Sequence, residues 1–96
     1  MPTKSIPHMD GLIRAFLSMK DADECACFLD DLCTYAELEA MAQRYHVAER
    51  LSAGDVYHII SAGSGVSTAT ISRVGRALKH GAGGYQIALD RRNCDK

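Results

Sequence analysis

The chain has 96 residues, of which 47% are hydrophobic and 24% charged, a composition typical of one small globular domain. No apolar run approaches the roughly 20 residues that a membrane-spanning helix needs. The N-terminal segment also lacks the pattern of a secretion signal, so we expect a cytoplasmic protein with no membrane partner. A chain of this size leaves much of its surface in water, which favours pairing with a second copy.

Charge is unevenly distributed along the chain, although the net charge is only -1. Residues 1–55 contain five Lys and Arg against ten Asp and Glu, whereas residues 56–96 contain six against two. No acidic residue occurs from Val56 to Leu89. The second part can therefore face a polyanion such as nucleic acid, while the first part stays in water.

Apolar residues recur at helical spacing after an N-terminal tail, residues 1–10, which holds both prolines and no periodic pattern. No segment alternates in the way a strand does, so the predicted fold class is all-α. A second tail is predicted at residues 90–96. The segments predicted to be helical are approximately 11–19, 21–32, 34–52, 55–62, 67–79 and 85–89.

Polar residues and glycines mark several of the predicted helix ends. Thr34 and Glu37 have the spacing of a capping box at the start of the third helix. The segment 52–55, Ser-Ala-Gly-Asp, is expected to end that helix and to cap the next one. Ser67 is expected to cap the helix that begins beside it.

Residues 60–74 read Ile-Ser-Ala-Gly-Ser-Gly-Val-Ser-Thr-Ala-Thr-Ile-Ser-Arg-Val and resemble the helix-turn-helix of bacterial DNA-binding regulators. Ser61 is small where two helices must cross closely, and Gly65 can adopt the positive φ of a sharp turn. Four apolar residues are predicted to hold the second helix against the first: Val66, Ile71, Val74 and Leu78.

The opposite face of the second helix suits the major groove of DNA. Ala69 can touch a thymine methyl group, and Arg73 can donate two hydrogen bonds to guanine. Tyr57 either shares a phosphate-binding role with His58 or packs in the core. The residues predicted to contact bases or phosphates are Ser67, Thr68, Ala69, Thr70, Ser72, Arg73, Arg76, Lys79 and His58.

Beyond the helix-turn-helix, a wider pattern includes Leu32-Cys33-Thr34, Gln43-Arg44, Val47-Ala48 and the segment from Arg76 to Tyr85. Together these segments are similar to the YerC/YecD branch of the Trp repressor superfamily over about residues 12–89. The resemblance implies a single helical domain, residues 11–89, that forms an intertwined homodimer through residues 11–52. The helix-turn-helix, residues 55–79, would then read a pseudo-palindromic operator in double-stranded DNA as a transcriptional repressor. The two reading helices would lie about 34 Å apart.

The same resemblance implies a place for a corepressor, and the sequence departs from the family there. Arg73 matches the arginine that stacks on the indole ring of tryptophan. Tyr45 stands where the family pattern has an arginine near the ligand carboxylate. Val74 stands where the family has a glycine that leaves room for the ring, and Ala77 replaces a serine that helps to hold the amino group. We therefore expect no response to tryptophan, and the identity of any other effector stays open.

The remaining polar residues suggest no catalytic or metal site. Cys25 and Cys27 would point about 200° apart on a helix, so their thiols cannot readily share one ion, and with Cys33 and Cys94 we expect them to be reduced and structural. No nucleophile, carboxylate pair or ligand set suggests an enzyme or a bound cofactor. Two alternatives stay open: a dimeric helical interaction module that has lost DNA recognition, and a thiol or metal sensor on the same fold.

Overall fold

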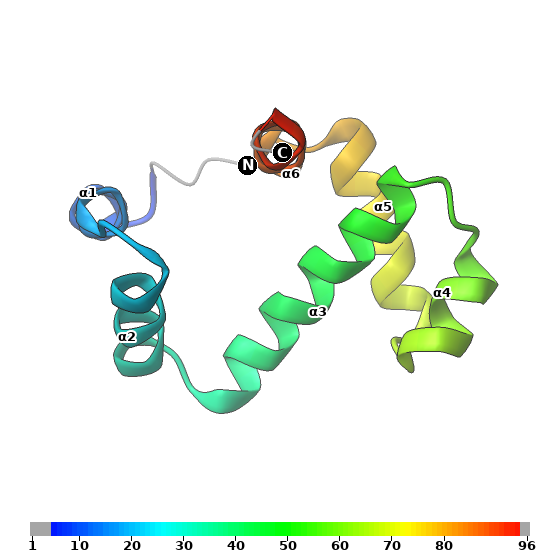
Figure 1. The fold of residues 1–96 in the computed structure, drawn as a ribbon, viewed down its shortest axis with the longest axis horizontal. Coiled ribbons are helices and arrows are strands. Elements are labelled where there is room, and N and C mark those ends of the chain that lie inside the picture. The colour runs from blue at the N-terminus through cyan, green and yellow to red at the C-terminus, as the bar shows by residue number, and fades with distance from the viewer. Residues whose placement is uncertain (1–4, 95–96) are drawn as a thin grey trace. The chain divides into compact units, whose positions relative to one another are not determined.

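A computed structural model describes residues 5–94 of the chain. Within this range it contains six α-helices and no strand, which confirms the predicted all-α class (Figure 1). No helix in the described part is long and apolar enough to cross a membrane. The helices are α1 Met9–Ser18, α2 Ala22–Leu32, α3 Tyr35–Ser52, α4 Tyr57–Ser64, α5 Thr68–His80 and α6 Gly84–Cys94.

The chain divides into two compact units, Met1–Leu38 and Glu39–Lys96. The boundary falls near the start of α3, well before the predicted junction between dimerisation helices and helix-turn-helix. The reason is that α3 gives two fully buried residues, Val47 and Ala48, to the core of the second unit. The dimerisation role expected for residues 11–52 stays a prediction.

The first unit has no closed core. Neither α1 nor α2 contains a buried residue. Phe16 and Phe28 form an edge-to-face pair, with ring centroids 5.0 Å apart and planes at 76°. Other large apolar side chains of this unit stay exposed: Ile6, Ile13, Leu17, Leu32 and Tyr35.

Side-chain caps fix the starts of α2 and α3, whereas α1 has no side-chain cap. Asp21 precedes α2 and accepts a hydrogen bond from the Glu24 backbone N–H at 2.8 Å. At the start of α3, the Thr34 hydroxyl accepts from the Glu37 N–H at 3.1 Å, and the Glu37 carboxylate accepts from the Thr34 N–H at 2.8 Å. The predicted capping box is therefore confirmed, with two otherwise free N–H groups satisfied.

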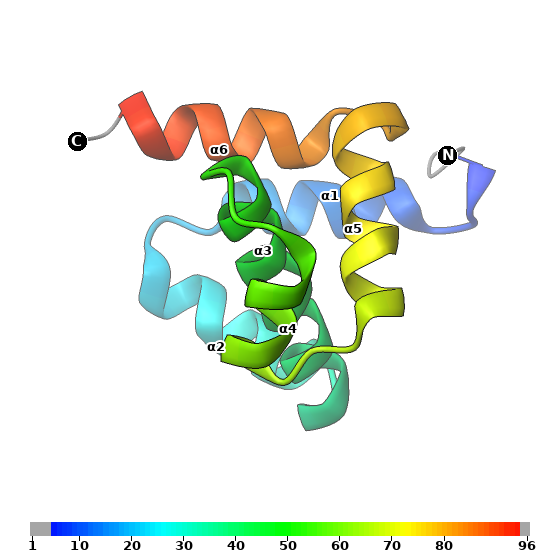
Figure 2. The same ribbon diagram turned by 90° about the vertical axis from the view of Figure 1, so that its right-hand side faces the viewer.

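The second unit is built around one apolar cluster. Figure 2 shows α5 beside α4, with α6 running across the C-terminal end of α5, and both pairs of helices are in contact. Burial of this cluster supplies the main stabilisation of the unit. Its buried members are Val47, Ala48, Ile60, Val66, Ile71 and Val74, against which Leu51, Leu78 and Tyr85 pack.

The connection between α3 and α4 differs from the prediction. Asp55 does not cap α4, because its carboxylate forms an ion pair with the Arg50 guanidinium. Val56 is the N-cap residue instead and offers no side-chain hydrogen bond, so α4 begins at Tyr57. Gly54 has a φ of 97°, as expected for a glycine that ends a helix.

Both predicted tails are too long. Helix α1 begins at Met9, and α6 extends to Cys94, far beyond the predicted short helix at 85–89. Residues beyond Leu89 are polar and give no apolar period to detect. They are held by ion pairing of Arg92 with Glu49 of α3. Residues 1–4 and 95–96 of the two predicted tails lie outside the described residues.

Candidate nucleic-acid interface

The turn between α4 and α5 has the geometry expected from its sequence. Gly65 has a φ of 73°, and its N–H donates to the Ser61 carbonyl at 2.9 Å. The Ser61 hydroxyl donates to the Val66 carbonyl at 2.9 Å. These two bonds join the end of α4 to the chain just after the turn. The direction of α5 relative to α4 is therefore fixed by the backbone as well as by the core.

Ser67 caps α5 as predicted. Its hydroxyl oxygen accepts from the Thr70 N–H at 3.2 Å, and it donates to the Thr70 hydroxyl at 3.1 Å. Thr70 is half-buried, so its hydroxyl belongs to the cap in this structure, although the sequence suggested a DNA contact. Thr68 is exposed beside it.

Helix α5 has one buried face and one exposed face. Ile71 is completely buried and Val74 is 2% exposed. The other side is open to solvent, and we call it the recognition face: Ala69, Ser72, Arg73 and Arg76. Two of its four side chains are small, which allows a close approach to a groove, and the other two are cationic hydrogen-bond donors.

Within the described part of the chain, no ion pair neutralises the positive charge on and beside this face. Arg73, Arg76 and Lys79 are exposed, and none forms an ion pair with another residue in the described part of the chain. His58 is also exposed, on α4. This arrangement leaves several charged or polar donors available for an anionic partner.

Gly75 is the residue of α5 whose role the sequence did not reveal. It is buried, and a Cβ atom built there would lie 2.5 Å from the Tyr57 hydroxyl oxygen and 3.7 Å from Leu51 Cδ1. The ring of Tyr57 therefore reaches across from α4 and ends directly over α5. A glycine in the middle of a predicted helix is the signal that could have indicated this close approach.

The surroundings of Val74 and Ala77 leave little that resembles a charged ligand site. Val74 is part of the buried core. Nearby, Tyr45 and Tyr85 are stacked, with centroids 6.4 Å apart and planes at 28°. A hollow of about 440 Å³ borders these rings and Ala77, and its lining contains no charged side chain.

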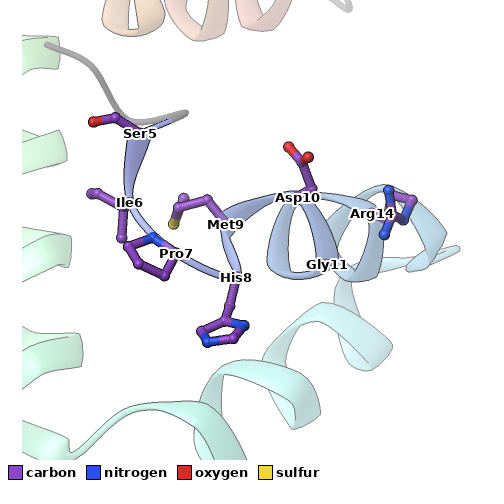
Figure 3. A pocket seen from close by; sticks show the side chains of 8 residues that line it. All are labelled: Ser5, Ile6, Pro7, His8, Met9, Asp10, Gly11 and Arg14. Carbon is purple, nitrogen blue, oxygen red and sulfur yellow. The ribbon is translucent and has the colours of Figure 1, made fainter.

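The other polar groups do not converge on a site. Cys25, Cys27 and Cys33 are free thiols, and the side chain of Cys94 lies outside the described part. Among the described residues, no three His, Cys, Asp or Glu side chains are grouped closely enough to hold a metal ion. A hollow of about 520 Å³ lies at the start of α1, but His8 and Asp10 point in opposite directions there (Figure 3).

Known proteins are similar to this chain in sequence and in the arrangement of their helices. The family model of the Trp repressor protein matches residues 7–93. Uncharacterized protein YerC of Bacillus subtilis (strain 168) is 51% identical over 83 residues, which are 86% of this chain and 80% of YerC. The crystal structure of a candidate Trp repressor from Staphylococcus aureus matches with a TM-score of 0.89 and 41% identity, over 97% of this chain and 95% of that one. A TrpR-like protein from Eubacterium eligens ATCC 27750 matches with a TM-score of 0.86 and 39% identity, over 93% and 92% of the two chains.

Proposed function

The chain belongs to the Trp repressor family, and we propose that it is a sequence-specific transcriptional repressor that reads the DNA major groove with α5. Family membership supports a DNA-binding regulator with no enzymatic role. The observation that carries the finer proposal is the recognition face. It combines small side chains with arginines that have no ion-pair partner in the described part, on a helix that is capped and fixed by its turn.

Base reading is assigned to three residues of the recognition face. Arg73 donates two hydrogen bonds to guanine, Ala69 packs on a thymine methyl group, and Ser72 bonds a base edge. All three are exposed on the side of α5 that faces away from the buried Ile71. The small size of Ala69 and Ser72 lets the backbone of α5 approach the bases.

Phosphate contacts hold the reading helix in register. Ser67 and Thr68 lie at the N-terminus of α5, where the free N–H groups and the helix dipole favour an anion. Arg76, Lys79 and His58 are exposed farther along the helix-turn-helix and are assigned to backbone phosphates.

The proposed assembly is a homodimer on a pseudo-palindromic operator. The first unit supports this assignment because α1 and α2 bury no residue, while Leu17 is 79% and Tyr35 80% exposed. A second copy would cover this apolar surface, which water otherwise contacts at a cost in free energy. Two-fold symmetry would then place two copies of α5 about one turn of DNA apart. A regulator of this kind works on chromosomal DNA, which implies a cytoplasmic location.

The proposed repressor does not respond to tryptophan. Val74 is buried in the core, so its side chain occupies space that a glycine would leave free. Ala77 has no hydroxyl to hold an amino group. The hollow beside Ala77 is lined without any charged group, which is a poor environment for an amino acid zwitterion.

The test is selection of bound fragments from sheared genomic DNA of the source organism by the purified full chain, with and without tryptophan, at two salt concentrations. We expect a short two-fold-symmetric site to be enriched, less so at high salt and equally with and without tryptophan. Arg73→Ala should reduce the enrichment, whereas Arg91→Ala should keep it, because it removes the same charge from an exposed position of α6. Absence of any enriched site would contradict the proposal and favour an interaction module.

A further inference from the structure

A hollow of about 400 Å³ opens within the second unit where the end of α3, the connection that follows it, the first residue of α4, the C-terminal half of α5 and α6 meet. Tyr57 and Asp55 line it on one side, and Gly75 and Lys79 on the other. It is distinct from the hollow beside Ala77. Helix α5 thus has a depression on the flank of its recognition face, and residues of four helices line it, including Leu51 of α3 and Gln86 of α6.

The flank of α5 is the part that would face the DNA backbone. Gly75 and Lys79 are four residues apart and lie on one side of α5, between the buried side and the recognition face. A helix that enters the major groove has phosphates along both of its sides. If the recognition face contacts bases, the flank that carries this hollow would face the DNA backbone.

The groups around the hollow are suited to an anion. The Lys79 ammonium and the Tyr57 hydroxyl are donors on exposed side chains. One carboxylate lines the hollow, that of Asp55, and its charge is balanced by the ion pair with Arg50.

We propose that this hollow holds one phosphate of the DNA backbone, gripped by the Tyr57 hydroxyl and the Lys79 ammonium. The inference rests on the proposed function and adds Tyr57 to the residues that contact DNA. A phosphate held from both α4 and α5 ties the whole helix-turn-helix to the duplex, and thereby sets how deeply α5 enters the groove.

Gly75 is needed for this position of the Tyr57 hydroxyl. A Cβ atom at this position would lie 2.5 Å from the Tyr57 hydroxyl oxygen, which is far inside van der Waals contact. Any other residue would displace the hydroxyl from its place over α5. The absence of a side chain at Gly75 is thus what allows the Tyr57 hydroxyl to lie over α5, in the same hollow that Lys79 lines.

The experiment measures the affinity of full-length variants for the selected operator and for an unrelated duplex across a salt series. Tyr57→Phe keeps the ring and removes only the hydroxyl. It should weaken binding about tenfold on both duplexes, as expected for a lost hydrogen bond to a charged group, with an unchanged salt slope. Lys79→Gln should weaken both and reduce the salt slope by about one. Gly75→Ala should behave like Tyr57→Phe, while Gly63→Ala, a helical glycine with nothing within 4 Å, should bind like wild type.

The outcomes separate this inference from the proposed function. If the wild type binds no duplex in a salt-dependent way, the proposed function itself fails. If the wild type binds its operator and Tyr57→Phe binds equally well, the phosphate site is wrong and the function stands. A Tyr57→Phe protein that loses preference for the operator, with unchanged affinity for the unrelated duplex, would also overturn the phosphate assignment, because it would make Tyr57 a base-reading residue.

Discussion

The two units of this chain bury their apolar residues to very different degrees. In the second unit, α3, α4 and α5 enclose Val47, Ile60 and Ile71, each at most 4% exposed. In the first unit, α1 and α2 enclose none, and Leu17 stays 79% exposed. The helix-turn-helix therefore shares a closed core with α3, whereas the N-terminal helices present an apolar surface suited to a second copy.

The largest expected effect is on the core of the second unit. Ile71→Ala removes a fully buried side chain and leaves a cavity, so it should lower the free energy of unfolding by about 2–5 kcal/mol. Ile59→Ala, at a 54% exposed position on α4, should change it by less than about 0.5 kcal/mol. Chemical denaturation of both variants measures the difference. Equal losses would mean that the cluster is not the core of this unit.

The proposed dimer interface on the first unit can be tested by placing a charged residue at one of its exposed apolar positions. Leu17→Asp would place a carboxylate in the proposed dimer interface, where burial of an unpaired charge should raise the dimer dissociation constant at least about tenfold. Ile59→Asp, at another exposed apolar position but in the second unit, should leave dimerisation unchanged. Analytical ultracentrifugation over a concentration series measures both. If Leu17→Asp leaves the dimer dissociation constant unchanged, the apolar surface of the first unit is not the dimer interface.

A smaller effect on stability is expected from removing a helix-capping hydroxyl in either unit. Ser67→Ala and Thr34→Ala each remove a hydroxyl that accepts a backbone N–H at a helix start, and each should cost about 1 kcal/mol of stability. Ser67→Ala should also weaken DNA binding, because the N-terminus of α5 would fray beside the recognition face. Thr34→Ala should not weaken it beyond its effect on dimerisation. Thermal unfolding and operator titration of the two variants check this pair.

The smallest effect concerns two glycines that are close in sequence. Gly63 lies inside α4 with open space around it, so Gly63→Ala should raise the free energy of unfolding by about 0.4–1 kcal/mol. Gly65→Ala should lower it, because a φ of 73° is unfavourable for alanine. Chemical denaturation measures both changes in the free energy of unfolding. Changes of opposite sign would confirm that the turn of the helix-turn-helix needs a glycine at position 65 and not at position 63.

Periodicity and turn chemistry predicted most of the second unit before its structure was known. Ser67 predicts the start of α5, and Gly65 predicts the turn before it. Ile71 and Val74 predict the buried face of α5. These are local signals, since a cap or a positive φ depends on residues a few positions apart.

Tertiary contacts were harder to foresee. The polar end of α6 is held by Arg92 and Glu49, which are 43 residues apart, so no local pattern indicates the pairing. Asp55 is the residue that the sequence predicts as the cap of α4, but its carboxylate forms an ion pair with Arg50 instead. The contact of Tyr57 with Gly75 is of the same kind, because only the packing of α4 on α5 brings the two residues together.

The measurement that tests the central claim most directly is titration of the selected symmetric operator with wild-type and Arg73→Ala protein at several salt concentrations. The account predicts two chains per duplex, affinity that falls steeply with salt, and a loss of about 5- to 150-fold for Arg73→Ala that is confined to the operator. Binding that ignores salt, or that Arg73→Ala leaves unchanged, would contradict the claim that α5 reads DNA.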